Sequence, residues 1–139
     1  SSITIQNLGF TNSAGQKKDP TLAEIFSSER AFALILRLHV RYPSHVANLN
    51  NQNEGLKTVL KNSLTQIKTE GLETKDFSKW TQRHQEILIE NIINKYPASK
   101  GIRTTLETVR DFTFKTDALS TAANSFSFNS DNLPPAPNY

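Results

Sequence analysis

The three histidines are the side chains best suited to acid–base or metal chemistry, because the 139-residue chain has no cysteine. His39 lies in the segment LRLHVRY, His45 in the polar segment PSHVANLNNQN, and His84 on the apolar stripe of an expected helix. None has a second histidine or a carboxylate three or four residues away in a metal-binding pattern. We therefore predict that His84 is a hydrogen-bonded core residue, and we expect no metal site.

Other catalytic fingerprints are also missing from the chain. The five glycines are scattered singly, so phosphate loops and dinucleotide-binding turns are not indicated, and Gly-x-Ser-x-Gly does not occur. The lack of cysteine excludes disulfides, thiolate zinc sites, iron–sulfur clusters and a cysteine nucleophile. Glu86 and Glu90 are one turn apart on an otherwise solvated face. We predict that the protein is not an enzyme and uses no cofactor, although an acid–base pair built across helices stays open.

Basic residues near expected helix ends form the candidate nucleic-acid site. The formal net charge is +3 and the sequence pI is near 9.3. The amides of a helix N-terminus attract anions, so Lys100 and Arg103 could bind phosphate there, and Arg37 and Arg41 occupy the matching place in the first half. The predicted phosphate contacts are Arg37, Arg41, Lys100, Arg103 and Arg110. The alternative is a solvated surface of mixed charge, which alternating basic and acidic residues favour.

The aromatic residues near these cations allow two interpretations. Tyr42, Trp80 and Tyr96 could stack on nucleic-acid bases. At helical spacing they more often pack in the core or at the ends of helical hairpins, and we favour that second interpretation.

Four amphipathic segments must position these residues. They are expected at 20–42, 54–69, from 74 or 76 to 95, and from Ser99 onward, ending near DFTFKT (111–116) or continuing to 123. Asp19-Pro20 favours a helix start, Pro43 and Pro97 end helices, and Gly71 favours a C-terminal cap. The predicted fold class is all-α: an antiparallel four-helix bundle at 19–123, with extended arms at 1–18 and 124–139.

The two halves of the bundle resemble each other and suggest a duplicated helical hairpin. Each contains a helix that ends in basic-Tyr-Pro, at Arg41-Tyr42-Pro43 and Lys95-Tyr96-Pro97. Each continues with Gly-apolar-basic-Thr-x-Leu, at 55–60 and 101–106. Coincidence stays open as the other interpretation, because the first connecting loop is longer.

The polar arms contain alternating apolar residues, a pattern that a solvated tail does not need. Two interpretations follow: the arms fold back onto their own bundle, or they dock on neighbouring subunits. The predicted assembly contacts are Ile3, Ile5, Phe10, Phe126, Phe128, Leu133 and Tyr139.

These observations favour a non-enzymatic structural subunit that self-assembles through its arms, as in a coat, capsid or filament, and that could enclose nucleic acid. One alternative is a monomeric binding module for a protein or an apolar ligand, and another is a nucleic-acid-binding protein. The sequence contains no apolar run near the roughly 18 residues of a membrane span. Because no signal peptide is visible, we expect a soluble protein, with a virion as one possible location.

Overall fold

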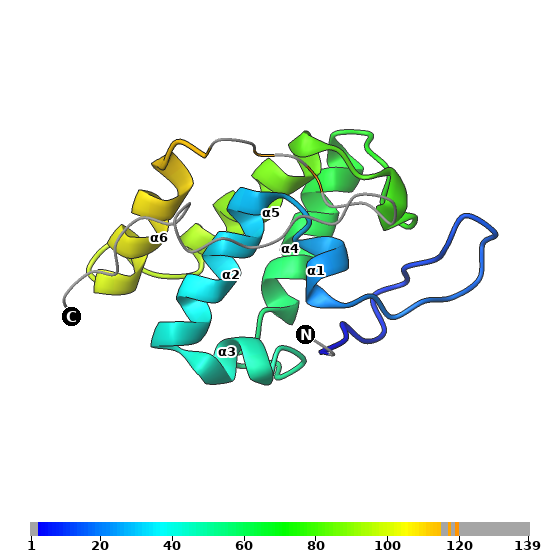
Figure 1. The fold of residues 1–139 in the computed structure, drawn as a ribbon. Coiled ribbons are helices and arrows are strands. Elements are labelled where there is room, and N and C mark those ends of the chain that lie inside the picture. The colour runs from blue at the N-terminus through cyan, green and yellow to red at the C-terminus, as the bar shows by residue number, and fades with distance from the viewer. Residues whose placement is uncertain (1–2, 115–116, 118, 120–139) are drawn as a thin grey trace.

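The computed structural model describes residues 3–114, 117 and 119 (Figure 1). In this part of the chain it contains six α-helices, one short 3-10 helix and a few isolated β-bridges. The elements are α1 (Leu22–Ile25), α2 (Glu29–Arg41), α3 (Pro43–Ala47), α4 (Lys57–Thr69), η1 (Phe77–Lys79), α5 (Gln82–Asn94) and α6 (Gly101–Asp111).

The four longer helices pack on one another around a shared apolar core. Helix α2 lies against α6 and α5, and α5 also contacts α4 and α6 (Figure 1). Each of these helices buries a leucine completely: Leu34, Leu60, Leu88 and Leu106. Removing these apolar faces from water stabilises the fold. The predicted all-α bundle is confirmed.

The single helix expected at 20–42 is instead two helices, α1 and α2. Thr21 caps α1, because its hydroxyl accepts from the Glu24 amide while the Glu24 carboxylate accepts from the Thr21 amide. Ser28 caps α2 by accepting from the Ala31 amide at 3.0 Å. Asp19, expected to start the helix, accepts from the Asn7 amide at 3.2 Å.

The break between α1 and α2 is stabilised by one buried glutamine from α5. The Gln85 Oε1 atom accepts from the amides of Ser27 and Ser28 at 3.0 and 3.2 Å. Its Nε2 atom donates to the Ile25 carbonyl at 2.8 Å and to the Ser27 hydroxyl at 3.0 Å. Gln85 thus pairs the polar groups that the break leaves unpaired inside the protein.

The connection after α2, which the sequence predicts to be a loop, contains helix α3. Pro43 does not only end α2; it also occupies the first turn of α3. Helix α4 begins at Lys57, after Gly55, where an added Cβ would lie 2.3 Å from the Leu49 carbonyl oxygen. The predicted cap at Gly71 is confirmed: its φ is 74°, and its amide donates to the Lys68 carbonyl.

The third expected helix is shorter than predicted, and the fourth ends at DFTFKT (111–116), which is one of its two predicted ends. The segment from 74 to 95 divides into η1 and α5, and the Thr81 cap starts α5. Helix α6 follows Lys100 rather than Ser99, and it ends at Asp111. Leu119, which the alternative end at 123 would place in this helix, instead forms an isolated β-bridge with Ser28. The β-branched and aromatic residues at 112–114 have weak helix propensity, which agrees with this early end.

The N-terminal arm folds back onto the helices. Ile5 and Phe10 are fully buried in the core, and Ile3 packs against it. The Ile5 amide donates to the Pro20 carbonyl, and the Thr11 amide donates to the Lys75 carbonyl. Beyond Phe10 the chain forms a loop that projects from the helices (Figure 1).

The contacts between helices are alike in the two halves only in part. Helix α2 packs on α6 as α5 packs on α4, but α5 also packs on α6, whereas α2 and α4 of the first half do not pack closely on each other. Leu56 and Leu60 are buried at the start of α4, as are Ile102 and Leu106 at the start of α6. Corresponding helices therefore bury corresponding positions.

The role of Gln85 can be tested by Gln85→Leu. This change leaves two buried amides and one carbonyl without partners, and each lost pairing costs about 1–3 kcal/mol. We expect the free energy of unfolding, measured with urea, to fall by at least about 3 kcal/mol. The control Gln66→Leu, on the exposed face of α4, should change it by less than about 0.5 kcal/mol. Equal effects would contradict the assignment.

Candidate nucleic-acid interface

The two Tyr-Pro segments of the sequence meet in space. The rings of Tyr42 and Tyr96 are parallel within 3°, with centroids 5.9 Å apart. The imidazole of His45 is parallel to both rings within 10°, at 4.8 Å from Tyr42 and 5.8 Å from Tyr96. Such parallel arrangements are favourable when the rings are offset. The cluster joins the end of α2, helix α3 and the turn after α5.

A hydrogen bond fixes this cluster. His45 Nδ1 lies 2.7 Å from the Tyr96 hydroxyl oxygen, and Tyr96 is only 6% exposed. Burial raises the pKa of Tyr96 well above its usual range. Burial lowers the pKa of His45, and the positive charge of Lys95 lowers it further, against an opposing effect of Glu54. Both groups are therefore neutral near pH 7, which suits a buried hydrogen bond between them.

A basic side chain lies over each of the two tyrosine rings. The Arg41 guanidinium carbon is 4.5 Å from the Tyr42 ring centroid, and Lys95 Nζ is 5.8 Å from the Tyr96 centroid. Lys100 is exposed in the turn that leads from Tyr96 into α6. We call the surface formed by Arg41, Tyr42, His45, Lys95, Tyr96 and Lys100 the tip surface.

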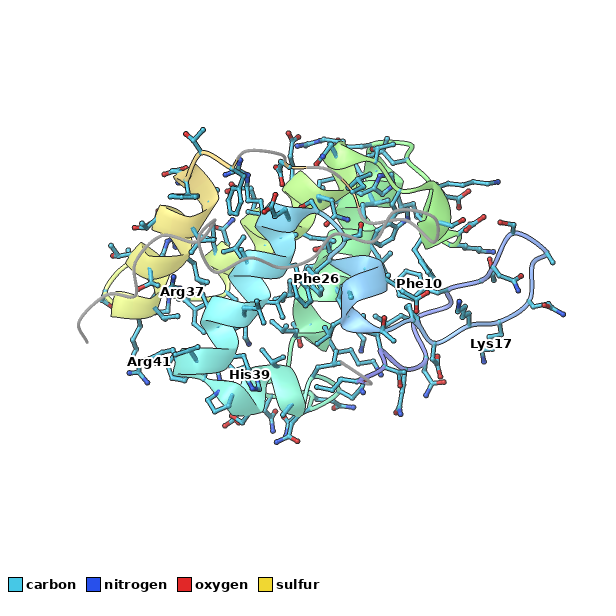
Figure 2. All side chains as sticks on the ribbon, viewed as in Figure 1. Phe10, Lys17, Phe26, Arg37, His39 and Arg41 are labelled. Atoms are coloured by element: carbon cyan, nitrogen blue, oxygen red, sulfur yellow. The ribbon has the colours of Figure 1, made fainter. Side chains whose placement is uncertain are left out.

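Of the five predicted phosphate contacts, two lie on the tip surface, and the other three are buried or have partners within the chain. Arg41 and Lys100 belong to the tip surface. Arg103 lies beside it but donates to the Tyr96 carbonyl at 3.1 Å and to Asn94 Oδ1 at 3.4 Å. Arg37 is only 8% exposed, on the side of α2 toward α6 (Figure 2). Arg110 pairs with Asp111 at 2.8 Å and with Glu90 at 3.5 Å.

His45, the residue that links the two tyrosines, is not predicted from the sequence. The pattern after Pro43 indicates a loop, where the position of a histidine carries no information. His45 is three residues after Tyr42 in the sequence. Because Pro43 starts helix α3, the chain turns at this point and the His45 ring lies against the Tyr42 ring. The Tyr-Pro-x-His spacing at 42–45 was the available signal.

The predicted assembly contacts have mixed positions. Ile5 and Phe10 are buried within the chain's own core, which supports the interpretation that the N-terminal arm folds back. In this arrangement they cannot contact a neighbouring subunit. Phe126, Phe128, Leu133 and Tyr139 lie outside the described residues.

His84 and Trp80 pack in the core, as favoured above. The His84 Nδ1 atom accepts from the Thr81 amide at 3.0 Å, and Nε2 lies 2.9 Å from the Glu73 carbonyl oxygen. Trp80 is 5% exposed and stacks on His84 within 15°. Among the described residues, no group of three or more His, Asp or Glu is placed to bind a metal ion.

A separate cleft of about 410 Å³ lies between the N-terminal loop, α1 and η1. Its charged groups pair within the chain: Lys18 with Glu24 at 3.3 Å, and Asp76 with Lys79 at 3.9 Å. Trp80 also lines this cleft, and its indole nitrogen is the one buried side-chain polar atom in the described part that lacks a partner. The alternative prediction is a module that binds a protein or an apolar ligand. This cleft is the concave surface at which such a module would bind its ligand.

Comparison with known proteins gives no relative: no family model, no curated protein and no solved structure matches the chain. No helix in the described part of the chain is long and apolar enough to cross a membrane.

The two partly or fully buried histidines predict how stability depends on pH. Burial lowers the pKa of both His45 and His84 below the ordinary value of 6.5. Below pH 6.5 the unfolded chain therefore binds protons that the folded chain does not bind. The free energy of unfolding should be nearly constant above about pH 7.5 and should decrease as the pH falls through 6.5.

Urea unfolding at about pH 7.5 and pH 5.5 measures this decrease. The double variant His45→Gln/His84→Gln should lose most of it. His39→Gln is the matched control, because His39 is exposed, and it should keep the decrease. An unchanged decrease in the double variant would show that other groups cause it.

Proposed function

We propose that this chain is a non-enzymatic structural subunit that binds nucleic acid through the tip surface and assembles with copies of itself. The observation that carries the first part is the convergence of two basic-Tyr-Pro segments, 54 residues apart in sequence, on one stacked cluster. This convergence brings Arg41 and Lys95 to the same end of the molecule. The non-enzymatic part rests on the missing catalytic fingerprints of the sequence.

Charge supports phosphate as the ligand of this surface. Arg41, Lys95 and Lys100 carry positive charge, and charged N–H groups form the stronger hydrogen bonds to phosphate oxygens. The whole chain also carries a net charge of +3, which favours encounter with a polyanion. Glu54 is the acidic residue whose charge acts on His45 in this cluster, and at His45 the opposing effect of Lys95 is the larger one.

The assembly part of the proposal depends on residues 124–139, because Ile5 and Phe10 of the N-terminal contacts are buried and Ile3 packs against the core. This segment lies outside the described residues, so its role rests on sequence: alternating Phe126 and Phe128, then Leu133 and Tyr139 around a proline-rich stretch. A coat or filament subunit, with a virion as its location, is the form of assembly that we propose.

Charge reversal at the tip surface tests nucleic-acid binding. The variant Arg41→Glu/Lys95→Glu/Lys100→Glu should weaken binding of a labelled single-stranded oligonucleotide by at least about tenfold at 50 mM salt. The slope of log affinity against log salt should become shallower by about 2, because each lost phosphate contact contributes about 0.7. Fluorescence anisotropy measures both quantities.

The matched control reverses three exposed lysines elsewhere, as Lys17→Glu/Lys68→Glu/Lys75→Glu. This variant has the same net charge, and Figure 2 shows Lys17 at the opposite end of the molecule from Arg41. The control should bind more tightly than the tip variant. If the two variants lose affinity equally, binding follows net charge and the tip surface is not the site.

Deletion of residues 125–139 tests assembly. We expect the shortened chain to sediment as a smaller species than the full chain while its circular dichroism stays helical, because the described core ends before this segment. Unchanged sedimentation would exclude assembly through the C-terminal arm.

A further inference from the structure

The aromatic rings of the tip surface take their stacking partners from the chain itself. Tyr42 is parallel to both His45 and Tyr96, and the Arg41 guanidinium also lies over its ring, 4.5 Å from the centroid. Tyr96 is 6% exposed and has the Lys95 ammonium over its ring. Proteins that stack on bases need an open ring face for each base. These rings therefore serve to hold the cluster together.

The charged side chains that this surface presents are cations. Lys95 is half-buried, and Arg41 and Lys100 are exposed. Of the three rings in the cluster, those of Tyr42 and His45 are partly exposed to solvent. The Arg41 guanidinium covers part of the Tyr42 ring. Contacts from such cations to phosphates position a protein on a nucleic acid but carry no sequence information.

We propose that the tip surface recognises the phosphate chain alone, so that its ligands are linear polyphosphates of any base composition, including chains without bases. This inference rests on the proposed function, because it concerns the same surface. It adds the ligand class: a repeated phosphodiester or phosphoanhydride backbone, with no contribution from base stacking or base-edge hydrogen bonds.

The test compares ligands of equal length on the full wild-type chain. The probes are an oligothymidylate, an oligoadenylate and an abasic oligonucleotide of about 20 units each, at one salt concentration. We expect the three dissociation constants to agree within about threefold, and inorganic polyphosphate should displace each probe. Abasic binding weaker than oligothymidylate or oligoadenylate binding by tenfold or more would overturn the inference while leaving the proposed function intact.

A variant separates the ring from the cations. Tyr42→Leu removes the partly exposed ring and keeps Arg41, Lys95 and Lys100. We expect the ratio of oligothymidylate to abasic affinity to stay the same, whatever the change in stability, because both ligands are measured on the same variant. A ratio that falls toward one from a higher wild-type value would show base stacking on Tyr42. Absence of binding to all probes would overturn the proposed function as well.

Discussion

The bifurcated hydrogen bonding of Gln85 is the interaction on which the arrangement of the bundle depends. Its amide satisfies two backbone N–H groups and one carbonyl where the chain changes from α1 to α2. A buried backbone break without such partners would cost several kcal/mol. Because Gln85 belongs to α5, one side chain both permits the break and fixes the position of α2 on α5.

Fixing the start of α2 against α5 also affects the far ends of both helices. Each runs 13 residues before its Tyr-Pro segment, so the two tyrosines reach the same end of the bundle. The cluster of Tyr42, His45 and Tyr96 then joins these ends by stacking and by one hydrogen bond. The Gln85 contacts near the start of α2 and the aromatic cluster at its end thus connect this helix to elements of the second half of the chain.

Local patterns predicted much of this fold, and long-range contacts explain most of the rest. The apolar period located the four longer helices, and Gly71 located a cap, because both signals depend on neighbouring residues. The break at 26–28 could not be read from sequence, since the polar groups of Ile25, Ser27 and Ser28 are paired there by a residue nearly 60 positions away. The buried N-terminal arm was left open between two interpretations, because alternating apolar residues fit either an intramolecular or an intermolecular partner.

The difference between local patterns and long-range contacts also explains why only two of the five predicted phosphate contacts belong to the tip surface. Sequence marks a cation but not its partners: Arg103 stabilises the backbone after α5, and Arg110 is paired with carboxylates. A carboxylate partner offsets the charge of a cation, whereas an aromatic ring orients a cation without adding negative charge. Lys95 over Tyr96 is placed in this second way. Helix ends rich in tyrosine and basic residues can therefore present oriented positive charge, and this property, rather than the count of basic residues, argues for phosphate at this end of the molecule.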